Sequence, residues 1–236
     1  ALLYTSGIVP EERGTSSNEL EYLYARGFLV DEFLNGLHTP GPQGGYGYNV
    51  TTFDPYLLDR VEFLHGPSSV LYGQGSPGGT VNLVSKMPTS TALHEMGIET
   101  GSYGRVRGFF DFSGRVDKDG KLLYRLTFDG FHTGTQTDHV YEERLAVAPS
   151  LTWRPTLNTS LTLYAQYQAD PDGGLYNAVP AYGTILPGKT SIPRNLDVGD
   201  PNFDRMSKME EFIGYIFTHR FDKIFSFKQQ YRYLYN

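Results

Sequence analysis

The sequence lacks cysteine altogether and contains a single tryptophan. Without cysteine the chain has neither a disulfide framework nor a thiolate metal site. No run of about 18 apolar residues is present, which excludes a membrane-spanning helix. Acidic residues outnumber basic ones and give a net charge of −6, which argues against nucleic acid as a partner because phosphate binding needs a basic surface. The first residues also lack the charged-then-apolar order of a secretory leader, so we expect any signal peptide to have been removed or to lie upstream.

Glycine and aromatic residues are abundant instead, with 27 Gly, 18 Tyr and 15 Phe. The region up to about Thr89 is irregular and punctuated by Gly and Pro, which predicts a small α+β globule of short strands and one or two short helices. A helical turn is expected over residues 57–61, after Asp54-Pro55, because proline suits the first turn of a helix. The short apolar stretches that we expect to be strands cover residues 20–25, 61–64 and 80–84.

From about Leu93 onward, apolar and polar residues alternate with a period of two. Segments of about ten residues with this pattern are typical of strands with one apolar and one polar face. If the apolar face meets lipid and the polar face meets a lumen, each residue's direction follows. The residues expected to face lipid are Leu145, Val147, Leu151, Leu161 and Leu163, and those expected to face the lumen are Ser150, Thr152, Gln166 and Gln168.

The connections between these segments alternate in length. Short turns are expected at residues 116–120, 154–158 and 221–224, and longer links at 130–140 and 171–206. Short turns at one end and long loops at the other are typical of outer-membrane barrels. A soluble all-β domain, such as an adhesion module, also alternates and stays open as an alternative. The length of the strands and the Tyr and Phe residues near their ends favour the barrel.

Residues 54–88 carry the most specific motifs. The sequence from Asp54 to Pro88 resembles the plug of TonB-dependent siderophore receptors, particularly the ferrichrome and ferrioxamine type, and the resemblance continues more weakly to the end of the chain. It implies an α+β plug domain over residues 1–89, with its N-terminus missing, followed over 90–236 by antiparallel transmembrane β-barrel strands. About seven strands can be recognised, whereas such plugged transporters close with about 22, so the barrel is incomplete in this chain. The matching pieces are RGF at 26–28, NGL at 35–37, GPSSVLYG at 66–73, PGG at 77–79 and NLVSK at 82–86.

The resemblance implies active uptake of an iron(III)–siderophore complex through the bacterial outer membrane, and no enzyme activity. It also implies energy from TonB, with ExbB and ExbD, through a periplasmic segment that this sequence does not contain, and outer-membrane lipid around the barrel. Iron(III) prefers oxygen ligands, which the siderophore itself supplies. The receptor therefore needs no intrinsic cofactor and no metal ligands, in agreement with histidines that show no ligand spacing.

Four residues correspond to cargo contacts in the family. Arg13 matches a plug arginine, Tyr48 a plug aromatic with Tyr46 beside it, and Tyr176 an aromatic of the first long loop. A hydroxamate chelate presents several oxygens on a partly apolar body, which suits a multi-donor guanidinium between aromatic walls. Ala178 stands where the family has a second loop aromatic. Each residue also has a simpler interpretation, as a solvated arginine or as a loop anchor.

Other residues correspond to the structural part of the plug. Arg26 and Glu62 resemble residues that hold the plug in the barrel wall. His65 stands where the family usually has an arginine before Gly-Pro, and an ordinary structural histidine is the more frequent interpretation. Glycine permits tight turns and proline fixes the backbone beside it. The turn-forming residues expected here are Gly66, Pro67, Gly73, Pro77, Gly78 and Gly79.

Three other functions are compatible with parts of the sequence. Residues 73–78 match the dinucleotide pattern G-x-G-x-x-G, but a strand-like sequence follows where a helix would have to open. A passive porin would lack the glycine-rich first region. A TonB-dependent receptor for a different cargo, such as a catecholate siderophore, vitamin B12 or a glycan, remains the nearer alternative.

Overall fold

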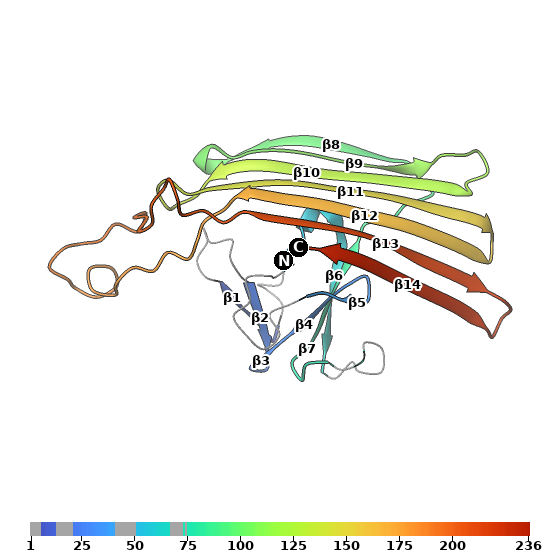
Figure 1. Cartoon of the computed structure of the whole chain (residues 1–236), viewed down its shortest axis with the longest axis horizontal. Helices are drawn as coiled ribbons and strands as arrows, with labels where there is room; N and C mark the ends of the chain where they lie inside the picture. The colour runs from blue at the N-terminus through green and yellow to red at the C-terminus, as the bar shows by residue number, and fades with distance from the viewer. Residues whose placement is uncertain (1–5, 13–20, 41–50, 67–72, 74) are drawn as a thin grey trace.

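The computed structural model describes residues 6–12, 21–40, 51–66, 73 and 75–236. The described residues form three sheets. One is a long seven-stranded sheet, called the wall below, and the two small sheets of the N-terminal region, called the plug, lie against one face of it (Figure 1). No helix among the described residues is long and apolar enough to cross a membrane.

The wall is an antiparallel meander, as the alternating pattern predicts. Each strand pairs with its sequence neighbour in the order β14-β13-β12-β11-β10-β9-β8. The strands are β8 (Leu93–Thr100), β9 (Val106–Arg115), β10 (Leu122–Gly134), β11 (Tyr141–Thr156), β12 (Thr159–Asp172), β13 (Lys208–Arg220) and β14 (Ser226–Tyr235).

The connections lie within two residues of the expected ranges except at two places. Strand β11 continues to Thr156 and β12 begins at Thr159, so the turn expected over 154–158 consists of two residues. Strand β10 continues to Gly134, which pairs with Tyr141, so the link expected over 130–140 is only six residues long. Both expectations were wrong because polar residues at the strand ends hide the alternation, while the backbone ladder continues through them.

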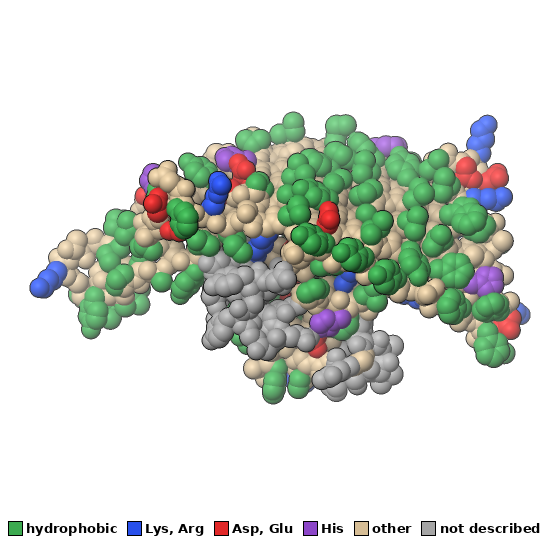
Figure 2. Space-filling view, in the orientation of Figure 1, with side chains coloured by type: hydrophobic (Ala, Val, Ile, Leu, Met, Phe, Trp, Pro, Cys, Tyr) green, Lys and Arg blue, Asp and Glu red, His purple; other side chains and the backbone are tan. Residues whose placement is uncertain are grey.

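The faces of the wall are as predicted. Leu151 pairs with Leu163, and these residues are 39% and 48% exposed on the outer face. Thr152, Gln166 and Gln168 are 4%, 5% and 2% exposed, because they face the opposite side. Figure 2 shows apolar side chains spread over the outer face, with charged side chains mostly gathered at the two ends of the strands.

The plug consists of short strands. The first sheet has the order β1-β2-β3 and the second β5-β4-β7-β6, in which β4 and β7 are parallel. The helical turn expected over 57–61 was wrong. A single 3-10 turn, η2 (Pro55–Leu57), precedes a strand that begins at Leu58, where pairing with Ser85 starts. The plug strands are β1 (Ile8–Glu12), β2 (Glu21–Ala25), β3 (Phe28–Leu29), β4 (Asp31–Leu34), β5 (Leu37–His38), β6 (Leu58–His65) and β7 (Gly79–Ser85).

Two apolar clusters explain why the plug stays folded against the wall. Ala25, Val30 and Val81 are buried within the plug itself. Leu34 of the plug packs with Tyr164 and Phe212 of the wall. The second cluster makes the core continuous across the boundary, so the two regions bury apolar surface together.

Candidate functional site

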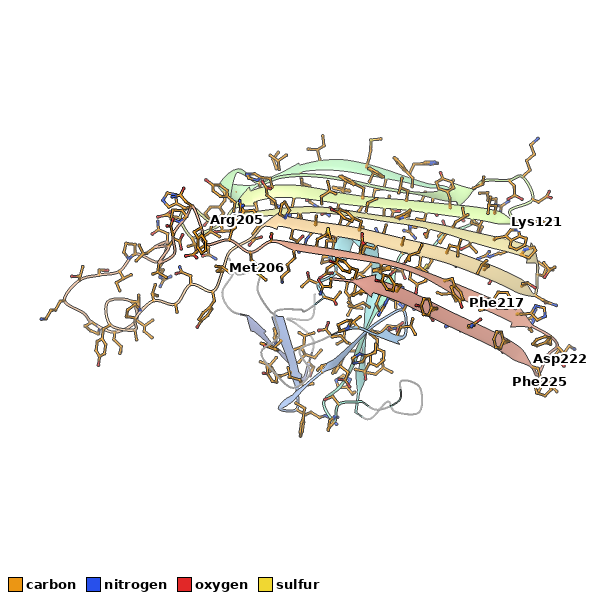
Figure 3. The ribbon with its side chains drawn as sticks, in the orientation of Figure 1. Lys121, Arg205, Met206, Phe217, Asp222 and Phe225 are labelled. Atoms are coloured by element: carbon orange, nitrogen blue, oxygen red, sulfur yellow. The ribbon has the colours of Figure 1, made fainter. Side chains whose placement is uncertain are left out.

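Three of the four predicted cargo contacts, Arg13, Tyr46 and Tyr48, lie outside the described residues, as does Pro67 of the turn-forming set. Tyr176 is half-exposed on the long connection between β12 and β13. That connection extends from one end of the wall, marked by Arg205 and Met206 in Figure 3, whereas the turns near Lys121 and Asp222 lie at the other end. The convergence of the four residues on one pocket stays a prediction.

Arg26, Glu62 and His65 lie within the plug. Arg26 is the first residue of the β2–β3 turn and has a φ of 54°. Glu62 accepts hydrogen bonds from Asn82 and Arg60, at 2.9 and 2.8 Å. The Nε2 atom of His65 lies 3.4 Å from the carbonyl oxygen of Ser6. These contacts join plug strands to one another, and their role toward the wall stays a prediction.

The bonds to Glu62 change its acidity. The hydrogen bond from Asn82 and the neighbouring Arg60 guanidinium lower the pKa of the Glu62 carboxyl below its ordinary value of 4.5. Hydrogen bonds to the charged form of a carboxylate favour that form. Glu62 is therefore ionised throughout the neutral range and ties β6 to β7.

Two of the predicted glycines, Gly78 and Gly79, lie where a side chain does not fit. A Cβ on Gly78 would lie 2.7 Å from the Ala25 carbonyl oxygen, and one on Gly79 would lie 2.5 Å from that of Leu64. Gly79 also has a φ of +127°, which side-chain-bearing residues rarely adopt. Gly66 and Gly73 have positive φ as well, and Pro77 is exposed beside Gly78. The glycines therefore let β7 run close under the β2–β3 turn.

The plug meets the wall through a segment that the sequence analysis did not single out. Residues 51–57, called the strap below, lie against strands β11 to β13. The backbone N–H of Thr52 donates to Glu210 at 2.7 Å, and that of Asp54 donates to Gln168 at 3.0 Å. Arg144 lies 3.4 Å from Asp54 and forms a two-bond ion pair with Asp170 at 2.7 and 2.8 Å.

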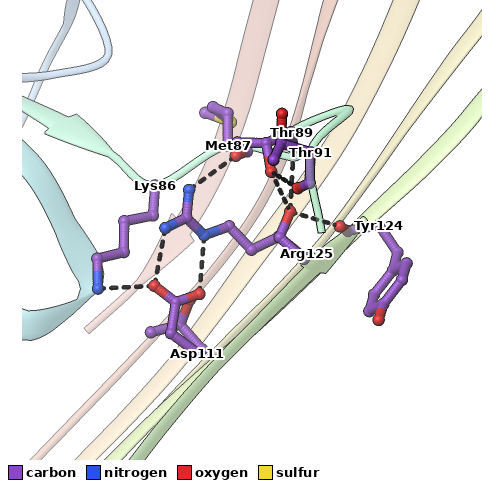
Figure 4. A network of polar contacts seen from close by, with 9 residues as sticks. Lys86, Met87, Thr89, Thr91, Asp111, Tyr124 and Arg125 are labelled. Carbon is purple, nitrogen blue, oxygen red and sulfur yellow. Dashed lines mark hydrogen bonds and ion pairs between the residues drawn. The ribbon is translucent and has the colours of Figure 1, made fainter. Parts of the chain in front are cut away.

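A second polar cluster holds the exit of the chain from the plug, residues 86–91, called the hinge below (Figure 4). Lys86 forms an ion pair with Asp111 at 2.8 Å. Arg125 binds both oxygens of Asp111, at 2.9 and 2.7 Å, and donates to the carbonyl of Met87 at 2.9 Å. Asp111 is 1% exposed, so its charge is compensated by these two cations rather than by water.

Tyr56 connects the strap to the hinge. The ammonium of Lys86 lies 3.9 Å from the centre of the Tyr56 ring, a cation–π geometry, and the ring of Phe109 packs edge-on at 5.0 Å. Burial, with the carboxylates of Glu95 and Asp111 nearby, raises the pKa of Tyr56 to about 12. The hydroxyl therefore stays neutral at physiological pH, and the face of the ring packs against the ammonium group of Lys86.

A third group of wall donors binds the β4–β5 turn. Arg232 on β14 donates to the carbonyls of Leu34 and His38, at 3.1 and 2.9 Å, and Gln230 donates to that of Asn35 at 2.7 Å. Asn35 and Gly36 both have positive φ, at 54° and 83°, as a two-residue hairpin turn of type I′ requires. Side chains of the wall thus donate hydrogen bonds to the backbone carbonyls of this turn.

The sequence of the chain is similar to those of known proteins. Residues 1–80 match the family model of the TonB-dependent receptor plug domain. The chain is 38% identical over its whole length to the ferrichrome outer membrane transporter/phage receptor of Escherichia coli K12, of which it covers 32%. It is 37% identical to the ferrioxamine receptor of Yersinia enterocolitica, covering 97% of this chain and 32% of that protein. The chain belongs to the TonB-dependent receptor family.

The fold of this receptor chain matches solved members. The pyoverdine outer membrane receptor FpvA of Pseudomonas aeruginosa superimposes with a TM-score of 0.81 at 22% identity, over 97% of this chain and 33% of that one. The Escherichia coli relative is named as an outer membrane transporter and the Yersinia enterocolitica relative as a receptor, and neither is named as an enzyme. The receptor is thus a protein of the bacterial outer membrane, and this chain spans about a third of the length of the curated relatives it matches.

One sequence signal, not used in the sequence analysis, indicates that the polar face of the wall is covered, although it does not identify the residues that contact the plug. The polar faces of the wall strands carry charged residues of both signs, and burying a charge is costly unless it is paired. A water-filled lumen does not require such pairing, whereas a plug packed against the face does. The members of this set are Arg107, Asp111, Arg125, Asp129, Arg144, Asp170 and Glu210.

Proposed function

We propose that the protein to which this chain belongs is an active-transport receptor for an iron(III)–siderophore complex of the hydroxamate type. The observation that carries the proposal is the 38% identity to a ferrichrome transporter, which runs through both the plug and the wall. Residues 1–89 then form the plug domain and residues 90–236 the first part of the barrel. Transport, and not catalysis, is the activity.

The proposed cargo site lies at the end of the wall from which the long connection extends. Arg13 supplies several N–H donors to the chelate oxygens, and Tyr46, Tyr48 and Tyr176 supply aromatic surfaces that pack against the chelate. Iron(III) arrives already coordinated by the siderophore, so the receptor has no cofactor of its own. Loss of one buried donor should cost about 1–3 kcal/mol of binding free energy.

The proposed partners follow from the same activity. TonB, with ExbB and ExbD, supplies energy from the periplasmic side, and outer-membrane lipid covers the apolar face of the wall. Leu151, Leu163 and Ile213 on that face are 39%, 48% and 62% exposed, which supports lipid contact because such residues are costly to leave in water.

A binding titration of the full-length receptor tests the proposal. Ferrichrome and ferrioxamine B are compared with a ferric catecholate of similar size. We expect the two hydroxamates to bind and the catecholate to bind at least tenfold more weakly. The opposite order would exclude the hydroxamate assignment.

A second candidate cargo is a different metal chelate. The chain is 33% identical over 177 residues to the metal-pseudopaline receptor CntO of Pseudomonas aeruginosa. Adding this class of metallophore to the titration separates the two candidates, because a receptor for it would prefer it to both hydroxamates.

A further inference from the structure

The ring of Phe131 on β10 lies among three arginines near the end of the wall from which the long connection extends. The guanidinium carbon of Arg105 is 4.5 Å from the centre of this ring, and that of Arg144 is 5.8 Å from it. Arg107 pairs directly with Phe131 across the ladder. Arg107 and Arg144 each form ion pairs with two carboxylates. The charges of these two guanidiniums are therefore compensated by the protein itself.

Arg105 differs from the other two arginines because its donors are not used. Among the described residues, its guanidinium donates no hydrogen bond and forms no ion pair. The carboxylate of Glu142 attracts it through space but forms no ion pair with it. A guanidinium carries five N–H donors in a planar fork, and its attraction to a ring needs no hydrogen bond from them. Arg105 is half-buried, so part of this fork is accessible at the surface of the wall.

The turn that precedes Arg105 holds the residue in place. This turn is η3 (Ser102–Gly104), and the backbone N–H of Arg105 donates to the carbonyl of Ser102 at 3.2 Å. The backbone N–H of Gly101 donates to the carbonyl of Arg105 at 3.0 Å. Arg105 itself has an extended backbone, so alternation along β9 places its side chain on the same face as Asp111, toward the plug. A group that is held before binding loses less freedom when a ligand arrives.

The long connection is fastened at the same end of β10. The side-chain amide of Asn195 donates to the carboxylate of Asp138 at 2.7 Å, and the backbone N–H of Asp138 donates to the carbonyl of Asn195 at 2.8 Å. Asp138 lies in the link between β10 and β11. Next to Tyr176, the amide of Asn177 donates to the carbonyl of Leu196 at 2.7 Å. Both arms of the connection are therefore tied to the end of the wall that carries the arginine cluster.

We propose that Arg105 and Phe131 form a cargo subsite on the wall. The guanidinium donates to the oxygens of the ferric chelate, and the ring packs against its apolar part. A multi-donor cation beside an aromatic surface is the chemistry that a hydroxamate chelate needs. In outer-membrane barrels the end with the long connections faces the outside of the cell, where cargo arrives. This inference rests on the proposed function for the identity of the ligand and adds two residues of the wall to the site proposed there.

The affinity test titrates the full-length receptor and its variants with ferrichrome. Arg105→Ala should weaken binding about tenfold, the loss expected for one removed charged hydrogen bond. Arg105→Lys keeps the charge but not the planar fork and should weaken binding about threefold. Phe131→Leu keeps an apolar side chain but removes the ring and should also weaken binding about threefold.

The matched control is Arg154→Ala, which removes an exposed guanidinium at the opposite end of the wall. The backbone N–H of Arg154 donates to the carbonyl of Lys121, which Figure 3 marks at that end. This variant should bind ferrichrome like the parent. Parental affinity in Arg105→Ala, or an equal loss in Arg154→Ala, would overturn the proposal.

A protection experiment locates the bound ligand directly. The receptor chain has no cysteine, so Arg105→Cys adds one thiol to it, and the parent receptor gives the labelling background. Saturating ferrichrome should slow the reaction of this thiol with a maleimide about fivefold or more, because a bound ligand covers the residues that line its site. The labelling of Arg154→Cys should not change. Equal rates with and without ferrichrome in Arg105→Cys would overturn the proposal.

Repeating the titration with a ferric catecholate of similar size separates this inference from the proposed function. If the parent binds only the catecholate, the hydroxamate assignment fails, but a loss of catecholate affinity in Arg105→Ala supports the subsite. If the parent binds ferrichrome and Arg105→Ala binds it equally well, the subsite fails and the hydroxamate assignment stands. An unchanged affinity of Arg105→Ala for whichever chelate the parent binds therefore refutes the subsite.

Discussion

The wall and the plug reach their structures by different routes. In the wall, each strand pairs with its neighbour in sequence, so local alternation is enough to specify both strand and partner. In the plug, each residue of β4 pairs with a residue of β7 that lies 49 positions further along the chain, and two of the strands are only two residues long. Strands this short are not stable alone and depend on the surface that covers them.

The two regions also differ in how they use charge. The outer face of the wall keeps most charges at its ends, whereas the face toward the plug buries ion pairs such as Arg125–Asp111 and Arg144–Asp170. A buried pair is fragile when one partner is lost, because the other is left uncompensated. We therefore expect the boundary between wall and plug to be the most sensitive part of the chain, and four predictions test this order.

The largest effect is expected at the hinge. Asp111→Ala leaves Lys86 and Arg125 without their shared carboxylate and should cost about 3–5 kcal/mol of unfolding free energy. Urea unfolding of the full-length receptor in detergent measures it. Asp119→Ala is the control, since that carboxylate is 73% exposed in a turn, 3.7 Å from Lys121, and should cost less than about 1 kcal/mol. Equal effects of the two variants would contradict the comparison.

The second-largest loss of unfolding free energy is expected inside the plug. Gly79→Ala forces a Cβ against the Leu64 carbonyl at a φ that alanine rarely adopts, and should cost about 3 kcal/mol. The plug should then become cleavable by protease in the folded receptor. Gly108→Ala on β9 has nothing within 4 Å of its new Cβ and should leave the cleavage pattern unchanged. A protease-resistant plug in Gly79→Ala would refute the steric argument.

A third prediction concerns the outer face of the wall. Leu151→Arg places a charge toward lipid and should cost about 2–4 kcal/mol if it lies near the middle of the bilayer. Unfolding from lipid vesicles measures this cost. Leu157→Arg at the fully exposed tip of the β11–β12 turn should be close to neutral. If Leu151→Arg were equally neutral, the outer face would not be the lipid face.

The smallest effect on stability is expected from acidification, which protonates the Glu62 carboxyl. Because the pKa of this carboxyl is lowered in the folded state, its contribution to stability is present above pH 4.5 and is lost as the pH falls below that value. The contribution is about 0.5 kcal/mol or less, since the Arg60 pair is half-exposed and screened. The comparison is the amide exchange of β6 and β7 at pH 6 and pH 3.5, in the parent and in Glu62→Gln.

The expected result is a smaller loss of protection on acidification in Glu62→Gln than in the parent, because the variant has no carboxyl to protonate. A larger loss in the variant would mean that the sign is reversed. This experiment measures how much the plug strands stabilise one another without the wall.

Most of the wall could be predicted from the alternation of apolar and polar residues. The alternation at residues 145–163 predicted the strands, their antiparallel order and the direction of Leu151 and Thr152, because period two and the direction of a side chain are the same property of a strand. It missed the strand ends at Thr156 and Gly134, where polar residues continue the ladder. The hairpin turn at Asn35-Gly36 was also within reach, since this pair is a strong signal for a type I′ turn.

The contacts between plug and wall were decided only by the tertiary structure. Nothing local distinguishes Glu210 or Gln168 from other polar residues of the wall, and their partners lie 158 and 114 residues away in the chain. Resemblance drew attention to Glu62 and His65, whose contacts lie within the plug. The physical reason is that alternation specifies which face a side chain is on, but not what covers that face. The choice of strap and hinge residues depends on how a compact plug, folded by its own glycine turns, fits the curvature and charge of the wall.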